Sequence, residues 1–330
     1  MADNVIVIRD LVKRFGDFTA VDGIDLTIKR GEIFGILGPN GAGKSTTINM
    51  LLSLLKPTEG KIIIDGIDIS SNPEAAKKKL GLMTQETVVE GDLTARQNLE
   101  LFAELYHVDR KEIPGRVEEA LKEAELTAFA DKRAQTFSGG MQRRLELVKS
   151  MIQRPDILVL DEPTTGLDIQ NRTRMWVHIR ELRKGGVTIL LTTQYLEESD
   201  QLCDRIAIID HGKIKAIGTP SELKRLAGSG RILDMTVEAG RVSEAGRILK
   251  SKFAIDASIV GDKIVAGVSN EKADKIAEIY KALTKAGINV LAIGVHLPTM
   301  DDVFIKLTGS GMRDATDDNA ASRISKVWRR

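Results

Sequence analysis

The stretch Gly38-Pro39-Asn40-Gly41-Ala42-Gly43-Lys44-Ser45-Thr46 follows an apolar run at residues 33–37 and opens a helix-like segment at residues 46–55. This is the strand–loop–helix context in which the pattern G-x-x-x-x-G-K-S/T binds phosphate. The glycines let several backbone N–H groups turn toward one anion, and the next helix directs the positive end of its dipole there. We therefore expect a nucleotide at this loop, with Lys44 at its β- and γ-phosphates and the Ser45 hydroxyl placed to ligate Mg2+.

The composition narrows the classes of function. The 330 residues include 48 Lys+Arg, 47 Asp+Glu and only 4% aromatic residues, which argues against a nucleic-acid partner. Cys203 is the one cysteine, so no intrachain disulfide is expected, a cytosolic setting fits, and the thiol is predicted to be buried and inert. The N-terminus lacks a signal-peptide pattern, and no apolar run approaches the about 20 residues that span a bilayer. Any membrane-spanning part is therefore expected in another chain.

Apolar patterns predict an α/β domain over residues 1–227, with a helical subdomain over about 87–155, where apolar residues recur at helical intervals. The runs 157–160 and 187–191 are continuously apolar, as in parallel strands that are buried on both faces. Further strands are expected at residues 5–8, 23–28, 60–64, 80–83 and 205–210, and further helices at 169–184 and 221–226.

A second, smaller α+β domain is predicted over residues 231–308, after a linker at 228–230. The expected elements are a strand at 232–237, a helix at 243–252, two strands within 257–268, a helix at 272–286 and a strand at 289–295. This βαββαβ order is the ferredoxin-like pattern. Residues 309–330 are polar and are expected to be disordered.

Two further motifs carry chemistry. Asp161-Glu162 stands at the carboxyl end of a predicted strand, where open α/β sheets bind ligands. Neighbouring strand residues point to opposite sides, so the two carboxylates are expected to serve different atoms; the alternative is a solvated acidic turn. Ser138-Gly139-Gly140 precedes an amphipathic helix and is, by itself, either a helix cap or a second anion site.

Together these motifs resemble those of the ATPase subunits of ABC transporters over residues 5–225. The phosphate loop, Gln85, Ser138-Gly139-Gly140, residues 157–163 and Gly166-Leu167-Asp168 follow in that family's order. Residues 192–198 and 298–304 resemble the branch that contains the daunorubicin/doxorubicin-resistance ATPases. The resemblance implies a P-loop NTPase fold that binds ATP and Mg2+. It also implies that two like chains form a head-to-tail dimer around two ATP. This dimer would drive a separate transmembrane permease and would lie at the cytoplasmic face of the membrane. The resemblance further implies export of a drug or another hydrophobic compound.

The resemblance also implies roles for single residues. Asp161, Ser45 and Gln85 match the residues that hold Mg2+, and Glu162 matches the general base for the attacking water. The catalytic set is Glu162, Lys44, Gln85 and Gln194. The nucleotide-binding set is Phe15, Gly38, Pro39, Asn40, Gly41, Ala42, Gly43, Lys44, Ser45 and Thr46, together with Ser138, Gly139, Gly140 and Asp168, which serve the ATP held by the other chain.

Two of these assignments carry an open question. Phe15 fits the aromatic residue that stacks on adenine, but Phe18 is a rival and Phe15 also fits an ordinary core residue. Most of the wider family has His where this chain has Gln194. Glutamine can hydrogen-bond a γ-phosphate but does not titrate near neutral pH, so Glu162 is expected to act as the base without a histidine relay.

Two other functions stay open at this point. One is a non-transport ABC protein that acts on ribosomes or DNA, although such proteins usually carry two ATPase units or a long basic or coiled-coil arm. The other is a regulatory module, in which the small domain senses a ligand and ATP only sets the state of assembly.

Overall fold

The computed structural model describes residues 4–228 and 230–309, which divide into two compact units. The first unit comprises the described residues up to Leu37 together with Ala42–Arg205 and His211–Lys213. The second comprises Gly38–Gly41, Ile206–Asp210 and the described residues from Ile214 onward. The domain boundary that we predicted near residue 228 stays a prediction.

A six-stranded sheet has the strand order β10-β9-β3-β8-β7-β6. Its strands are β3 (Ile33–Leu37), β6 (Leu80–Met83), β7 (Ile157–Asp161), β8 (Thr188–Thr193), β9 (Arg205–Asp210) and β10 (Lys213–Gly218). Strands β3, β8, β7 and β6 pair in parallel. The first four residues of β7 and all of β8 are buried, as their continuous apolar runs predicted, and β3 is buried throughout as well. Because these strands are parallel, β7 and β8 end at the same edge of the sheet, at Asp161 and Thr193, beside the end of β3.

An antiparallel sheet has the order β2-β1-β4-β5. Its strands are β1 (Asn4–Phe15), β2 (Phe18–Lys29), β4 (Glu59–Ile64) and β5 (Ile67–Asp68). The strands predicted at 5–8 and 23–28 are parts of longer strands. The turn between them is only Gly16-Asp17, because Phe15 pairs with Phe18 across it.

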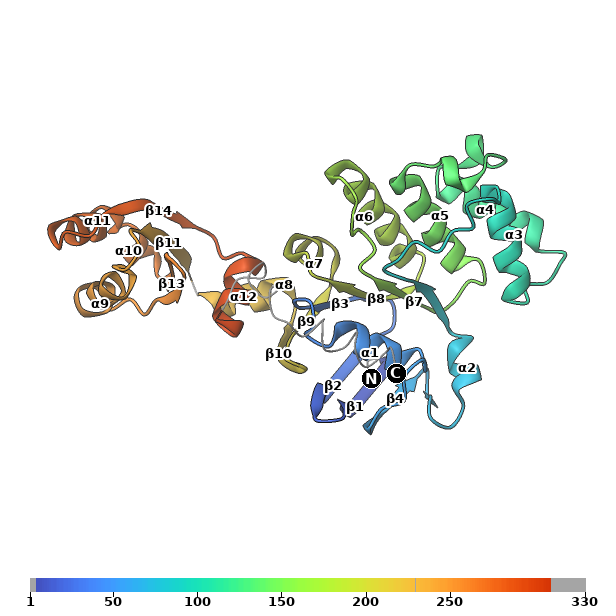
Figure 1. The fold of residues 1–330 in the computed structure, drawn as a ribbon, viewed down its shortest axis with the longest axis horizontal. Helices are drawn as coiled ribbons and strands as arrows, with labels where there is room; N and C mark the ends of the chain where they lie inside the picture. Colours follow the sequence, from blue (N-terminus) through green and yellow to red (C-terminus); the bar gives the residue numbers. More distant parts are fainter. Residues whose placement is uncertain (1–3, 229, 310–330) are drawn as a thin grey trace. The chain divides into compact units, whose positions relative to one another are not determined.

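The helices of the first unit lie between these strands in sequence. They are α1 (Lys44–Leu51), α2 (Pro73–Lys77), α3 (Ala95–Leu105), α4 (Ile113–Glu123), α5 (Gly139–Met151), α6 (Ile169–Lys184) and α7 (Leu196–Leu202), with two short 3-10 turns, η1 (Thr127–Phe129) and η2 (Ala134–Thr136). Helices α3, α4 and α5 gather into one cluster around a core that includes Leu99, Val117 and Leu145 (Figure 1). The predicted helical character of this region is confirmed. Helix α7 and strand β10 were not predicted.

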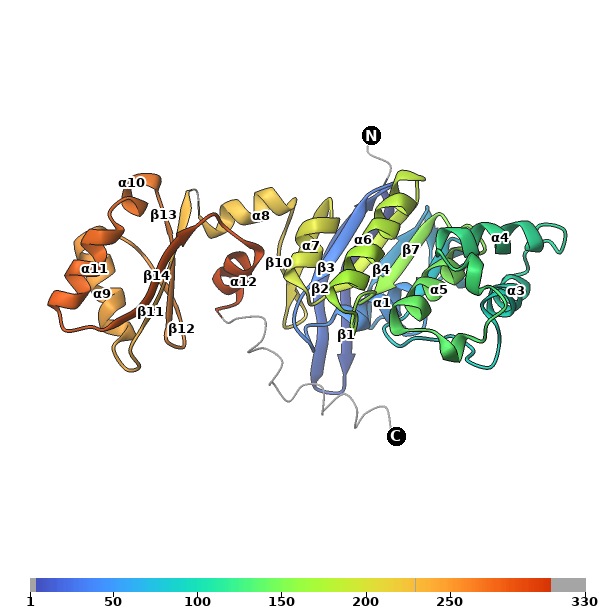
Figure 2. The same cartoon turned by 90° about the horizontal axis from the view of Figure 1, so that it is seen from above.

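The second unit contains the ferredoxin-like arrangement that the sequence predicted. Its elements are α8 (Pro220–Ala227), β11 (Arg231–Val237), α9 (Val242–Phe253), β12 (Ser258–Val260), β13 (Lys263–Val268), α10 (Asn270–Ala273), α11 (Ile276–Lys285), β14 (Val290–His296) and α12 (Met300–Thr308). The sheet order β12-β13-β11-β14 is antiparallel throughout, and α9, α10 and α11 cover one of its faces (Figure 2). The predicted disordered tail lies, from residue 310 onward, outside the described residues.

Among residues 4–228 and 230–309, no helix combines the length and the apolar character that crossing a lipid bilayer requires.

Candidate nucleotide site

The phosphate-loop sequence forms a turn of unusual backbone conformation before α1. Gly41 and Gly43 have φ angles of 83° and 104°, in the left-handed region that favours glycine. A Cβ atom on Gly43 would lie 2.6 Å from the carbonyl oxygen of Ala20, so this position also needs glycine for space. Helix α1 then begins at Lys44, whose side chain is buried, while Ser45 is exposed.

Lys44 and Glu162 form a buried ion pair. Lys44 Nζ lies 3.5 Å from Glu162 Oε1, and the two side chains are only 5% and 6% exposed. Burial lowers the pKa of the Lys44 ammonium, and the negative charge of Glu162 opposes that effect. The structure thus places a buried ammonium directly after the turn of the phosphate loop and beside the Glu162 carboxylate.

Glu162 does not continue strand β7. Its φ angle is +48°, a left-handed conformation that is uncommon for a residue with a side chain. The Glu162 amide donates to the carbonyl of Thr192 (3.1 Å), which holds this conformation in place. The expected strand alternation of Asp161 and Glu162 is therefore wrong, because the chain turns at Glu162. The alternative of a solvated turn is wrong as well, since Glu162 is 5% exposed.

The second carboxylate oxygen of Glu162 is held by two donors. The Thr165 hydroxyl donates to Glu162 Oε2 at 2.9 Å, and Gln194 Nε2 donates to the same oxygen at 3.2 Å. Gln194 directly follows β8, which explains how it reaches Glu162 at the end of β7. The structure thus brings together Lys44, Glu162 and Gln194, three of the four residues that were predicted to be catalytic.

Asp161 ends β7 beside Thr192 of β8. The Thr192 hydroxyl donates to Asp161 Oδ1. Burial raises the pKa of the Asp161 carboxyl, while the hydrogen bond from Thr192 favours its charged form. The sequence pattern did not single out Thr192, although its position in the run Thr192-Thr193-Gln194 at a strand end was visible.

Arg143 is the second residue that sequence reasoning missed. It lies in α5, yet it is buried and donates to three backbone carbonyls: those of Thr84 (2.9 Å), Glu162 (2.9 Å) and Pro163 (3.1 Å). Its guanidinium also pairs with Glu146 at 2.8 Å. Arg143 thus ties the segment before Gln85 and the turn at Glu162 to one helix. A buried arginine within a helical pattern gives no sequence signal that separates it from an exposed one.

Ser138-Gly139-Gly140 begins α5 as a capped helix start. The Ser138 hydroxyl accepts from the Met141 amide at 3.3 Å, while Ser138 and Gly139 are exposed. Gly140 packs against the side chain of Asn171 in α6. Asn171 in turn donates to both carboxylate oxygens of Asp168, which caps α6. The predicted residues Gly140 and Asp168 are therefore close to each other in one chain, at two adjacent helix N-termini.

Gln85 and the two aromatic candidates are more accessible. Gln85 is exposed in a bend after β6. Phe15 and Phe18 are both half-buried, and the Lys13 ammonium lies 5.0 Å from the Phe15 ring centroid. Phe15 is thus not a core residue, but the choice between Phe15 and Phe18 stays a prediction.

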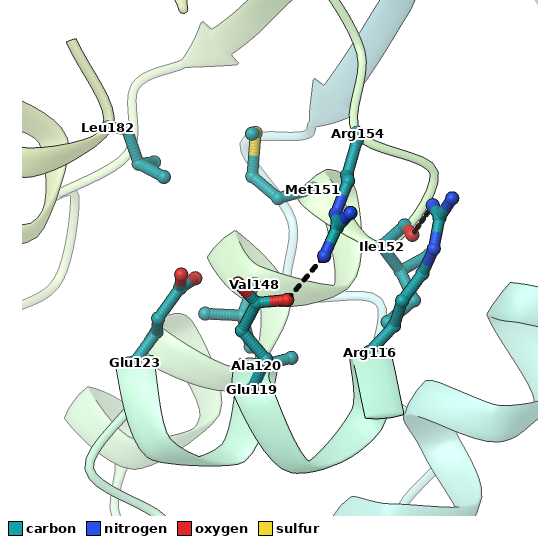
Figure 3. A pocket seen from close by; sticks show the side chains of 9 residues that line it. All are labelled: Arg116, Glu119, Ala120, Glu123, Val148, Met151, Ile152, Arg154 and Leu182. Atoms are coloured by element: carbon teal, nitrogen blue, oxygen red, sulfur yellow. Dashed lines mark hydrogen bonds and ion pairs between the residues drawn. The ribbon is translucent and has the colours of Figure 1, made fainter. Parts of the chain in front are cut away.

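A small hollow is lined by a different set of residues. Residues of α4 and the end of α5 line it, with Leu182 of α6 at its edge (Figure 3). Arg154 pairs with Glu119 at 2.6 Å there, and Arg116 donates to the carbonyl of Ile152 at 2.9 Å. None of the predicted site residues lines this hollow, so we do not assign it to the nucleotide.

Known proteins match both the fold and the sequence. A solved dimeric ATP-binding cassette, bound to ADP and Pi, superposes with a TM-score of 0.58 and 28% identity, covering 65% of this chain and 98% of that one. A daunorubicin resistance ATP-binding protein of Streptomyces coeruleorubidus is 40% identical over 95% of this chain and 98% of its own length. A Nod factor export ATP-binding protein of Cupriavidus metallidurans is 36% identical over 94% and 99%.

The sequence profile described as "ABC transporter" matches residues 21–165. With the near full-length relatives, this match shows that the chain belongs to the family of ABC transporter ATP-binding proteins. It is an ATPase that binds ATP, and its fold is the P-loop α/β fold that the phosphate-loop sequence predicted.

Proposed function

We propose that this chain is the ATP-hydrolysing subunit of an exporter, in which two copies drive a separate membrane permease that moves a drug or another hydrophobic compound. The names of the daunorubicin resistance and Nod factor export relatives support the direction of transport. The structural observation that carries the proposal is the buried Lys44–Glu162 ion pair, with Gln194 on the same carboxylate, at the carboxyl edge of the parallel sheet. The permease holds the chain at the cytoplasmic face of the membrane.

In this proposal the loop at residues 38–46 binds the triphosphate through its backbone amides and Lys44, and Phe15 stacks on the adenine. Glu162 accepts a proton from the attacking water. Thr165 and Gln194 orient its carboxylate, and Gln194 also contacts the γ-phosphate. Because glutamine does not titrate, the proton stays on Glu162 until it leaves to solvent.

The residues assigned to Mg2+ fit the chemistry of that ion. Asp161, Ser45 and Gln85 offer hard oxygen donors, which Mg2+ prefers. The described residues contain no group of three or more His, Cys, Asp and Glu side chains that could form a metal cage. That fits an ion held by one carboxylate, waters and substrate phosphates. When bound, Mg2+ neutralises charge on the β- and γ-phosphates.

The head-to-tail pairing is part of the proposal. Ser138 and Gly139 are exposed at the N-terminus of α5, and Asp168 is exposed at the N-terminus of α6. Exposed amides at a helix N-terminus suit an anion. We assign the amides at Ser138-Gly139-Gly140 to the γ-phosphate held by the second chain, and we place Asp168 on the seam between the two chains. The dimeric form of the solved cassette supports this pairing.

Glu162→Gln tests hydrolysis and pairing together. We expect ATP turnover to fall by at least about 100-fold, because the general base is removed. ATP binding should persist, so the variant should accumulate as a dimer at saturating Mg-ATP. A coupled ATPase assay and light scattering measure the two effects. Glu197→Gln, an exposed glutamate on α7, is the matched control and should behave as wild type.

Two outcomes would contradict the proposal. A monomer of Glu162→Gln at saturating Mg-ATP would remove the shared-site pairing. ATP turnover that rose with nucleic acid, but not with membranes that contain the permease, would favour a non-transport ABC protein.

A third result addresses the regulatory alternative. Steady ATP hydrolysis by wild type that is lost in Glu162→Gln would argue against a purely regulatory module.

A further inference from the structure

Glu198 is a buried carboxylate that the proposed mechanism does not use. It lies in α7 and is 0% exposed. The Thr164 hydroxyl donates to Glu198 Oε1 at 2.7 Å, and the indole N–H of Trp176 in α6 donates to the same oxygen at 3.0 Å. The other oxygen, Oε2, is buried and has no well-formed hydrogen bond among the described residues, but the Thr193 side chain of β8 also favours the charged form of this carboxyl. Burying a carboxyl group costs free energy unless hydrogen bonds replace its lost hydration. The burial of Glu198 therefore needs a structural or functional reason.

The two segments that Glu198 connects both lead to Glu162. Thr164 directly precedes Thr165, whose hydroxyl donates to Glu162 Oε2. On the other side, α7 follows β8 after only Gln194 and Tyr195, and Gln194 donates to that same oxygen. A displacement of α7 from the loop after Glu162 therefore changes the distance between the two donors of the Glu162 carboxylate.

Resting on the proposed function, we propose that Glu198 is a positioning residue for ATP hydrolysis, which acts through Thr165 and Gln194. Its Oε1 atom fixes Thr164 and Trp176 against α7. This sets Thr165 and Gln194 on Glu162 Oε2 and aims the carboxylate at the attacking water. Glu198 contacts neither the phosphates nor the water. Burial raises the pKa of the Glu198 carboxyl, while the hydrogen bonds from Thr193, Thr164 and Trp176 favour its charged form.

Three variants separate positioning from simple packing. Glu198→Leu removes the acceptor and leaves Thr164 and Trp176 unpaired, so kcat should fall by up to roughly 100-fold, the size of effect that a small misplacement of a catalytic group produces. The KM for ATP should change much less than kcat, because the phosphate loop and Lys44 supply most of the contacts to the triphosphate and are not touched. Glu198→Gln keeps an acceptor oxygen at Oε1 and should restore kcat close to the wild-type value. Leu202→Ala, a buried residue on the same helix, should lower the melting temperature without lowering kcat.

A double-mutant cycle tests the route of the effect. If Glu198 acts through Gln194, then Glu198→Leu should lower kcat much less in a Gln194→Ala background than in wild type. Equal, additive losses would overturn the proposal, and so would a wild-type kcat in folded Glu198→Leu. If Glu162→Gln itself hydrolysed ATP at the wild-type rate, the proposed function would fail instead. The two failures are therefore distinguishable.

Discussion

Glu162 shows how a single residue can depart from its sequence pattern at a functional position. Its left-handed backbone conformation carries a conformational cost and persists only where the surroundings impose it. Here the amide is held by Thr192 and the carbonyl by Arg143. Both partners are distant in sequence, so the alternation of a strand could not reveal the turn. The pairing of Lys44 with Glu162 was equally hidden, although each residue was predicted separately.

Lys44→Ala should lose ATP affinity. A charge-assisted hydrogen bond is worth about 1.5–3 kcal/mol, so we expect the Kd for ATP to rise by roughly 10- to 100-fold. Fluorescence titration with a labelled nucleotide measures this change. Lys122→Ala, an exposed lysine of α4, is the control and should keep the wild-type Kd. Unchanged affinity in folded Lys44→Ala would refute our assignment of the loop.

The adjacent starts of α5 and α6 define a second testable feature. A Cβ atom on Gly140 would lie 2.4 Å from Asn171 Oδ1, whereas a Cβ atom on Gly139 would have nothing within 4 Å. Asn171 is held by two hydrogen bonds to Asp168 and has little freedom to move. We therefore expect Gly140→Ala to lower the free energy of unfolding by about 1–3 kcal/mol, as overpacking does. Gly139→Ala should leave it nearly unchanged.

Denaturant unfolding of these two glycine variants gives the comparison. A Gly140→Ala protein as stable as Gly139→Ala would show that the two helix starts do not pack as described. Asn171→Ala should relieve the effect of Gly140→Ala, because it removes the contacting amide.

Asp168 makes the stability of α6 depend on pH. The Asn171 amide hydrogen bond lowers the pKa of the Asp168 carboxyl below its ordinary value of 3.8. A lowered folded-state pKa contributes stability that is present above pH 3.8 and is lost as the pH falls through the folded-state value. Asp168→Ala should therefore lower the melting temperature at pH 7 and have a smaller effect near pH 3. Equal effects at both pH values would contradict the capping role.

The regular elements differ in how far sequence could define them. Helix α6 has the predicted bounds, and the buried parallel strands follow their continuous apolar runs. Strand β10 was missed although Lys213–Gly218 alternates between exposed and more buried residues, because the run is short and half-polar. Helix α7 was missed because seven residues rich in acidic side chains carry no clear apolar period. It is nevertheless the helix that carries Glu198.

The ferredoxin-like order of the second unit followed from the succession of short patterns, and the sheet confirms it. The boundary between domains is harder to predict than the order of elements, because local patterns do not report contacts between distant segments. We still predict a linker at residues 228–230, and proteolytic cleavage is expected to concentrate at such linkers. Limited proteolysis should first yield fragments that end near residue 228, as mass spectrometry would measure. First cleavage inside residues 87–155 would contradict this.

Cys203 is the one cysteine of the sequence and is 6% exposed, and burial raises its pKa well above the ordinary value. A thiol in this state reacts slowly, since the thiolate is the reactive form. The native chain is thus already suited to site-directed labelling. A maleimide dye or spin label attached to one new surface cysteine would report from that position alone, with no background to remove by mutation.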